Sequence, residues 1–263
     1  MSDRITSFKV GNLKLEVHPT RQAAGAAAAQ AAAEELRRLG SLGDTIGVIF
    51  ATGASQFETL DALTSIPGLP WGNVQGFHMD EYVGLDAYHP ASFRRYLRER
   101  LTRRVAMREF HEMDGDAADM ESFGREYIHK LNLANPKLCL LGVGENGHLA
   151  FNDPAVADFS DPQAIKVVAL DDACRRQQIA EGWFESFDAV PEQALTLTIP
   201  TLFRVPKLIA SVPGLRKAQV VRRTLEEPIS TNCPSTLLRT HHDATIYLDL
   251  DSASELDKAS SSN

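Results

Sequence analysis

Residues 45–55 read Thr-Ile-Gly-Val-Ile-Phe-Ala-Thr-Gly-Ala-Ser, an apolar run that stops at a turn of small residues. The run over Thr45–Thr52 predicts a buried strand, and Gly53-Ala54-Ser55 predicts a tight turn after it. A helix is expected from about Gln56 to Ser65. A strand, a short turn and a helix in this order form the repeating unit of α/β folds.

The same unit recurs in both directions along the chain. Further strands are expected at Leu13–Val17, Val74–Met79, Lys137–Gly142, Ile165–Leu170, Ala194–Ile199, Lys207–Val212 and Thr245–Leu250. Further helices are expected after Thr20 and His89-Pro90, over Met120–Leu133, from Asp172, and over Leu215–Leu225. This alternation predicts a mostly parallel, doubly wound, Rossmann-like sheet with helices on both faces. We expect one domain over residues 1–251 and a polar, frayed tail over residues 252–263.

Composition narrows the class of function. The formal net charge is −8, which disfavours binding to nucleic acid or to an anionic membrane surface. The cysteines Cys139, Cys174 and Cys233 are widely spaced and form no CxxC pair, so we expect no metal site. No apolar run approaches the length of a membrane span, and the N-terminus shows no apolar signal region. A cytoplasmic location is the expectation.

Two of the loops that follow strands suit an anion. Thr52, Gly53, Ala54 and Ser55 place backbone N–H groups and hydroxyls at the start of a helix, which is a common way to bind phosphate. Lys217 falls in the first turn of the helix after Pro213-Gly214, where a cation is unfavourable unless an anion accompanies it. An ordinary turn and a solvent-facing lysine remain the alternatives for these two segments.

Two other loops carry groups suited to proton transfer. Asp80 and Glu81 are adjacent carboxylates at a strand end, and one of them can act as a base in a site. Gly142–His148 contains a GxGxxG pattern, but Asn152-Asp153-Pro154 ends any helix too soon for a dinucleotide site. The loop instead presents His148 near Asp153, a pair suited to acid–base chemistry near neutral pH.

Two blocks of sequence resemble a known family. Met79–Leu85 reads M-D-E-Y-V-G-L and is followed by H-P-x-S at His89–Ser92, while Gly142–Asn152 reads G-V-G-x-N-G-H-x-A-F-N. In order and spacing these blocks are similar to those of glucosamine-6-phosphate deaminases, over roughly Val10 to Asp251. The related 6-phosphogluconolactonases carry D-E-R where this chain has Asp80-Glu81-Tyr82, so the deaminase is preferred.

The resemblance implies an amino-sugar-phosphate isomerase/deaminase, which converts glucosamine 6-phosphate to fructose 6-phosphate and ammonia without a metal or organic cofactor. It implies Asp80 as the proton-transferring carboxylate and His148 as the ring-opening histidine, with Asp153 and Asn146 beside it. It implies a substrate site formed by Thr52, Gly53, Ala54, Ser55, Glu81, Gly144, Lys217 and an arginine, Arg175 or Arg176, of which we take Arg176. Family members occur as single subunits or as homo-oligomers.

Three departures leave other functions open. The family has Glu at the position of Asp153, often an acid at Asn146, and commonly Asn at His78. The alternatives are therefore a non-deaminating sugar-phosphate isomerase, a 6-phosphogluconolactonase-like hydrolase, or a sensor that binds a sugar phosphate without turnover.

Overall fold

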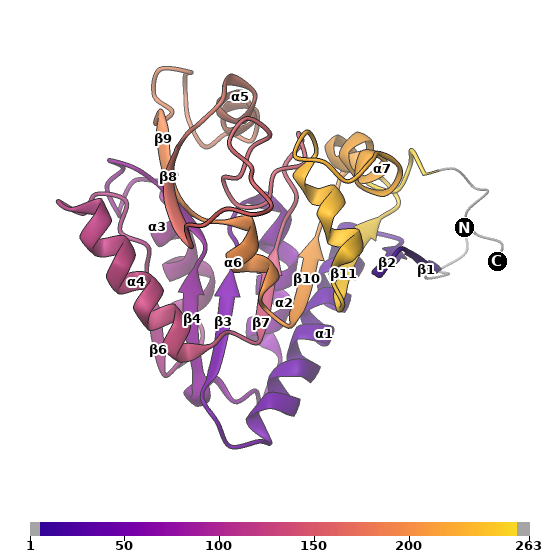
Figure 1. Ribbon diagram of the computed structural model, residues 1–263. Coiled ribbons are helices and arrows are strands. Elements are labelled where there is room, and N and C mark those ends of the chain that lie inside the picture. Colours follow the sequence, from indigo (N-terminus) through magenta and orange to yellow (C-terminus); the bar gives the residue numbers. More distant parts are fainter. Residues whose placement is uncertain (1–5, 257–263) are drawn as a thin grey trace.

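The computed structural model describes residues 6–256, which form two sheets and the helices packed against them (Figure 1). The strands are β1 (Thr6–Val10), β2 (Leu13–His18), β3 (Ile46–Phe50), β4 (Val74–His78), β5 (Asp80–Tyr82), β6 (Glu109–His111), β7 (Leu138–Leu141), β8 (Ile165–Ala169), β9 (Gln193–Leu197), β10 (Lys207–Ser211) and β11 (Ala244–Asp249). The α-helices are α1 (Arg21–Gly40), α2 (Phe57–Ser65), α3 (Phe93–Leu97), α4 (Met120–Ala134), α5 (Asp172–Ala180), α6 (Ile199–Phe203) and α7 (Ala218–Glu226).

The larger sheet has eight strands in the order β1-β2-β11-β10-β7-β3-β4-β6. Every neighbouring pair is parallel except β1 and β2, so the predicted mostly parallel sheet is confirmed. From β3 the chain continues to β4 on one side, whereas from β7 its next strand in this sheet is β10 on the other side. The strand order therefore reverses between β3 and β7, and the crevice beyond such a reversal is where open α/β sheets bind ligands.

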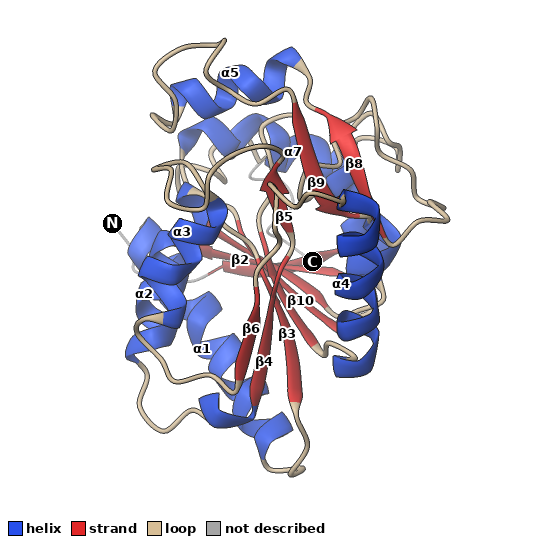
Figure 2. Ribbon diagram, turned by 90° about the vertical axis from the view of Figure 1, so that its left-hand side faces the viewer, coloured by secondary structure: helices blue, strands red, loops and turns tan. Residues whose placement is uncertain are grey.

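Alternate residues of the central strands build two separate cores. Leu138 and Leu140 of β7 pack in the cluster that contains α1 and α2, whereas Cys139 and Leu141 pack in the cluster that contains α4, α6 and α7. Successive side chains of a strand point to opposite faces, so a continuous apolar run such as Leu138–Leu141 needs helices on both. Figure 2 shows α1, α2 and α3 on one side of the sheet and α4 on the other.

Two of the strands expected from the sequence lie outside the parallel sheet. β8 and β9 form a separate three-stranded antiparallel sheet with β5, in the order β5-β9-β8. Residues Asp80–Tyr82, which we expected to form a loop, are β5 itself. This sheet lies with α5 beyond the carboxyl ends of β3 and β7 (Figures 1 and 2).

Sequence patterns also missed several short elements and placed the tail too early. β1, β6 and α6 were not predicted, because each is only three to five residues long. Ser252, expected to begin a frayed tail, is buried and hydrogen-bonds through its N–H to the Asp249 carboxylate at 2.8 Å. Residues 257–263 of the predicted tail lie outside the described residues.

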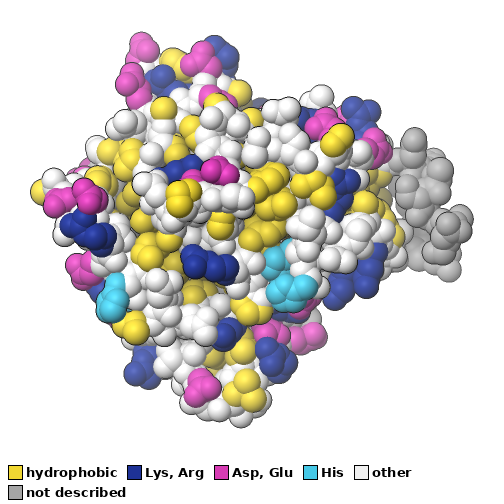
Figure 3. Space-filling view, in the orientation of Figure 1, with side chains coloured by type: hydrophobic (Ala, Val, Ile, Leu, Met, Phe, Trp, Pro, Cys, Tyr) yellow, Lys and Arg dark blue, Asp and Glu magenta, His cyan; other side chains and the backbone are white. Residues whose placement is uncertain are grey.

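Within residues 6–256 no helix is both long and apolar enough to cross a membrane. Basic and acidic side chains are interspersed on the face shown in Figure 3, as expected for a chain of modest net charge.

Candidate active site

A pocket opens at the carboxyl ends of β3 and β7, where the strand order reverses and where open α/β sheets bind small molecules. The pocket brings together segments that are far apart in the chain, and its lining contains eight of the twelve residues proposed from the sequence: Thr52, Gly53, Ala54, Ser55, Asp80, Gly144, His148 and Lys217.

The loop after β3 is held in a shape that suits an anion. Gly53 has φ = +88°, a value that L-residues with a side chain rarely adopt, and it precedes a 3₁₀ turn that runs into α2. The buried Gln56 donates through Nε2 to the Leu141 carbonyl at 3.0 Å, and the Tyr96 hydroxyl donates to the Gly53 carbonyl at 2.9 Å. These contacts fix the loop against β7 and α3.

Lys217 lines the same pocket as this loop and is only 6% exposed. It follows Gly214 and ends the 3₁₀ turn that leads into α7, as the sequence predicted. Burial lowers the pKa of the Lys217 ammonium, and the nearby carboxylates of Glu181 and Glu145 offset part of this effect. A buried ammonium with a lowered pKa is stabilised when an anion binds beside it.

Asp80 sits where the chain passes from one sheet to the other. It comes two residues after the end of β4, and it pairs with Thr196 of β9 as the first residue of β5. Its carboxylate is 6% exposed, and one oxygen, Oδ1, has no hydrogen-bond partner among the described residues. Burial, together with the charge of Glu81, raises the pKa of Asp80 well above its ordinary value. Such a carboxyl group is suited to taking up and releasing a proton.

Glu81 does not line the pocket, although the sequence proposed it as a substrate ligand. Its carboxylate is fully buried and accepts hydrogen bonds from the backbone N–H groups of Tyr82, Phe93 and Arg94 and from the Ser92 hydroxyl. Burial raises the pKa of Glu81, and these four bonds counteract the rise. Because the oxygens are occupied, Glu81 joins β5 to the start of α3 and has no free acceptor for a ligand.

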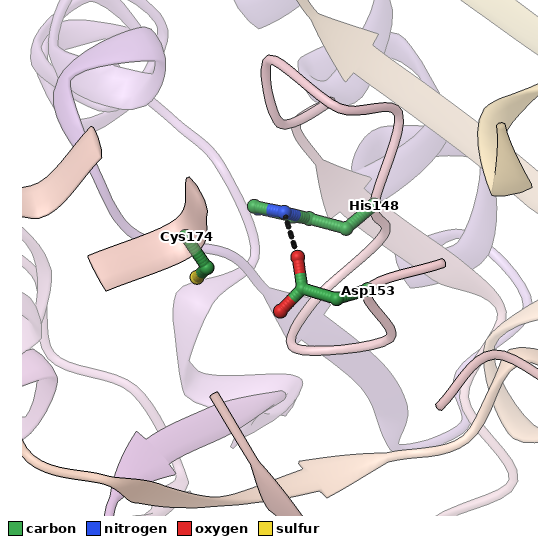
Figure 4. Close-up of side chains that lie close together, drawn as sticks. All are labelled: His148, Asp153 and Cys174. Atoms are coloured by element: carbon green, nitrogen blue, oxygen red, sulfur yellow. Dashed lines mark hydrogen bonds and ion pairs between the residues drawn. The ribbon is translucent and has the colours of Figure 1, made fainter. Parts of the chain in front are cut away.

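His148 and Asp153 form the pair that the sequence predicted. The His148 Nδ1 atom lies 2.7 Å from Asp153 Oδ1, and Figure 4 shows the two side chains facing each other. Asn146 donates from Nδ2 to the same oxygen at 2.8 Å and accepts the His148 backbone N–H at 3.0 Å. Burial would raise the pKa of Asp153, but His148 and the amide of Asn146 outweigh it and lower that pKa.

Asp153 is therefore ionised near neutral pH and accepts a proton that His148 carries on Nδ1, so Nε2 is the ring atom left for a ligand. Asp153 and Asn146 do not line the pocket; they lie behind His148 and set its orientation. The shorter side chain of Asp153, compared with the Glu of the family, still reaches the imidazole.

Cys174 lies beside His148 and Asp153 (Figure 4). One potential ligand atom from each of these three residues lies within 4.8 Å of the other two. These residue types can bind zinc. The distance between His148 and Asp153 is that of a hydrogen bond, and burial raises the pKa of the Cys174 thiol, which disfavours the thiolate that a metal needs. The arrangement fits a hydrogen-bonded histidine and carboxylate better than a metal centre.

The predicted arginine does not reach the pocket. The Arg176 side chain is 67% exposed and pairs with Asp172 one turn earlier on α5, at 3.0 Å. Arg175 donates to the Phe187 and Val190 carbonyls and stacks on the Phe187 ring. The pocket is lined by Gln177, Gln178 and Glu181 and by neither arginine. In a helix with 3.6 residues per turn these three lie on the same face as Cys174.

Comparisons with known proteins identify the family of the chain. The family model described as glucosamine-6-phosphate isomerases/6-phosphogluconolactonase matches residues 19–247. The glucosamine-6-phosphate deaminase of Listeria monocytogenes serotype 4a is 33% identical over 213 residues, which cover 81% of this chain and 88% of that relative. The glucosamine-6-phosphate deaminase of Corynebacterium glutamicum is 31% identical over 237 residues, or 88% and 90% of the two chains.

Solved structures show the same fold. A monomeric glucosamine-6-phosphate deaminase superposes with a TM-score of 0.83 at 28% identity, covering 92% of this chain and 99% of that one. The 6-phosphogluconolactonase of Trypanosoma brucei has a TM-score of 0.75 at 19% identity, covering 92% and 98%, a likeness of fold alone. The family resemblance inferred from the sequence is confirmed, and the chain belongs to the glucosamine-6-phosphate isomerase/6-phosphogluconolactonase family.

Proposed function

We propose that this protein is a glucosamine-6-phosphate deaminase. It opens the ring of glucosamine 6-phosphate, moves a proton from C2 to C1 and, with the uptake of water, releases ammonia and fructose 6-phosphate. The curated relatives that are at least 31% identical carry this activity in their names. The observation that carries the proposal is Asp80, a buried carboxylate in the pocket with a free oxygen and a raised pKa.

Asp80 acts as the base in this proposal. A proton on the carbon next to a carbonyl or imine is weakly acidic, and a carboxylate in a partly dry pocket is a competent acceptor for it. The carboxylate takes the proton from C2 and returns it to C1, so it is regenerated in each turnover. The same negative charge favours a substrate that bears an ammonium group at C2.

His148 opens the ring. Its Nε2 atom accepts the proton of the C1 hydroxyl and passes it to the ring oxygen as the C1–oxygen ring bond breaks, which produces the open-chain aldehyde and regenerates the neutral imidazole. Asp153 keeps Nδ1 engaged at 2.7 Å, and Asn146 in turn holds the Asp153 carboxylate with a hydrogen bond of 2.8 Å. A fixed imidazole spends less of its time in unreactive orientations, which raises the rate of proton transfer.

The phosphate binds between residues 52–55 and Lys217. The tight turn at Gly53, the start of α2 and the buried ammonium of Lys217 support this placement. A phosphate held away from the reacting carbons supplies binding energy that orients C1 and C2 against Asp80 and His148.

Lactone hydrolysis is the alternative within the family. Tyr82 occupies the place of the lactonase arginine, and its ring is fully buried against Phe93, Phe151 and Phe184. Among the described residues that line the pocket, Lys217 is the one lysine, and no arginine lines it. The part of the pocket around Asp80 thus lacks the second cation that the lactonase motif supplies, which favours an aminated substrate.

The test is an assay of purified protein with glucosamine 6-phosphate in which ammonia and fructose 6-phosphate are followed together. We expect equal amounts of both products and no acid release from 6-phosphogluconolactone. Fructose 6-phosphate from a different aldose phosphate without ammonia would establish plain isomerisation instead. Thermal stabilisation by glucosamine 6-phosphate without any product would identify a sensor.

A further inference from the structure

We propose that Gln178 binds a hydroxyl in the middle of the substrate's carbon chain, on C3 or C4, and so helps to decide which sugar phosphates the pocket accepts. This inference rests on the proposed function, because it uses the positions of the phosphate and of the reacting carbons given above. Nothing in the resemblance to the family assigns a role to this residue.

Gln178 is a polar side chain placed in the pocket without a partner. It lies on α5, is 6% exposed and lines the pocket. Its side-chain amide has no hydrogen-bond partner among residues 6–256. The neighbouring Gln177 differs, because its Nε2 donates to Glu181 at 2.8 Å and its Oε1 accepts the Glu145 backbone N–H at 3.2 Å. An amide that lines a pocket without a protein partner offers its donor and its acceptor to a ligand.

The position of Gln178 along α5 indicates which part of the ligand it meets. Cys174, one turn before Gln178, lies beside His148 and Asp153 at the end where the chemistry takes place. Glu181, about one turn after Gln178, lines a neighbouring hollow together with Lys217 at the phosphate end. One turn of an α-helix rises by about 5.4 Å, so Gln178 lies between the two ends. In an open-chain 6-phosphate, C3 and C4 lie between the reacting C1 and C2 and the phosphate on C6.

The chemistry of the amide suits a hydroxyl at this point. A carboxamide both donates and accepts, as a hydroxyl does, and it adds no charge to a pocket that already contains Lys217 and Asp80. A ligand that lacks the hydroxyl, or presents it on the other face, leaves the buried amide unpaired and binds more weakly. The pocket would therefore distinguish sugars that share the phosphate and the amino group but differ at one carbon.

The test measures binding and does not depend on turnover. The probes are the unreactive sugar alcohol 2-amino-2-deoxyglucitol 6-phosphate, its 3-deoxy and 4-deoxy counterparts, and inorganic phosphate. Dissociation constants are measured by calorimetry for the wild type, for Gln178→Ala and for Gln219→Ala. Gln219 is an exposed glutamine on α7 and serves as the matched control.

We expect Gln178→Ala to weaken binding of the parent alcohol about threefold to tenfold, the usual effect of one lost hydrogen bond. Binding of one of the two deoxy compounds should change less than twofold, because that compound lacks the hydroxyl that Gln178 contacts. Binding of inorganic phosphate should be the same in all three proteins, and Gln219→Ala should match the wild type throughout.

Two results would overturn the inference. Equal weakening of the parent and of both deoxy compounds would mean that Gln178 only shapes the pocket. Weakened binding of inorganic phosphate would place the amide in the phosphate site. Failure of the proposed function is a separate outcome, because ammonia release by the wild type is assayed independently. If the wild type releases no ammonia but the binding constants differ as expected, the role of Gln178 stands and the protein catalyses a different reaction.

Discussion

Gly144 lies directly against the catalytic candidate His148: a Cβ atom on Gly144 would be 2.2 Å from both Cε1 and Nε2 of the imidazole. The glycine thus gives the ring the space in which it turns Nδ1 toward Asp153. The resemblance to the family implied Gly144 as a substrate ligand. The structure shows a further role, because any side chain at this position would collide with the imidazole of His148.

Gly144→Ala should abolish most of the activity while leaving the protein folded. The methyl group collides with the far end of a side chain that can swing away, so the cost falls on the orientation of His148 rather than on the core. We expect kcat to fall about 100-fold or more, as for loss of a general acid–base group. Gly72→Ala is the matched control, because no atom lies within 4 Å of its Cβ position. Equal activity of the two variants would contradict the assigned role of His148.

Asp80→Asn should lose the proton-transfer step and retain phosphate binding. We expect kcat to fall about 100-fold or more, with inorganic phosphate stabilising the variant against heat as much as it stabilises the wild type. Turnover close to that of the wild type would show that another group is the base.

The same substitution should not destabilise the protein at neutral pH. The pKa of Asp80 is raised in the folded state, so its ionisation opposes folding above that pKa, and the effect disappears below the ordinary pKa of 3.8. The melting temperature of Asp80→Asn should therefore equal or exceed that of the wild type at pH 7, and the difference should vanish near pH 4.

Lys217→Ala should mainly raise KM. The ammonium is buried in the pocket, and at the proposed phosphate site its removal weakens substrate and transition state alike. We expect KM to rise about tenfold or more, as for a lost charged hydrogen bond, with a smaller change in kcat. Lys130→Ala, which removes a half-exposed lysine paired with Glu126 on α4, is the control and should change neither constant. A loss confined to kcat would place Lys217 at the reacting carbons instead.

Arg176→Ala should leave KM and kcat unchanged. Its guanidinium is solvated and its ion pair with Asp172 is of the exposed kind that contributes little to stability. Steady-state kinetics check this directly. A tenfold rise in KM would mean that α5 rotates when substrate binds and that the assignment from the sequence was right.

His78→Asn should reduce the sensitivity of the protein to mild acid. His78 is fully buried, and burial together with the charge of Arg94 lowers its pKa to about 3. Because the unfolded chain binds this proton at about pH 6.5, stability falls as the pH drops from there toward 3. Between pH 7 and pH 5 this loss is on the order of 2 kcal/mol, and His78→Asn should lack it. Urea unfolding of both proteins at the two pH values measures the difference, and identical losses would refute the linkage.

The sequence by itself determined the elements that depend on local patterns. The apolar run before Gly53, repeated along the chain, predicted the parallel sheet and its helices, because a strand buried on both faces must read as continuous apolar sequence. The strand ends then indicated Asp80, His148, Lys217 and residues 52–55, since carboxyl ends of parallel strands meet at one edge. The two quoted blocks predicted the family.

Only the tertiary structure decided how distant segments meet above that edge. β5 pairs with β9 across more than 100 residues, and no local pattern states that Asp80 faces Thr196. Glu81 reads in sequence like a second active carboxylate, yet the backbone of α3 occupies its oxygens. On α5 the side chains that reach the pocket are Gln177, Gln178 and Glu181 instead of Arg176, because the rotation of the helix about its axis is set by the packing of Cys174 against Asp153, a contact between segments that the sequence leaves apart.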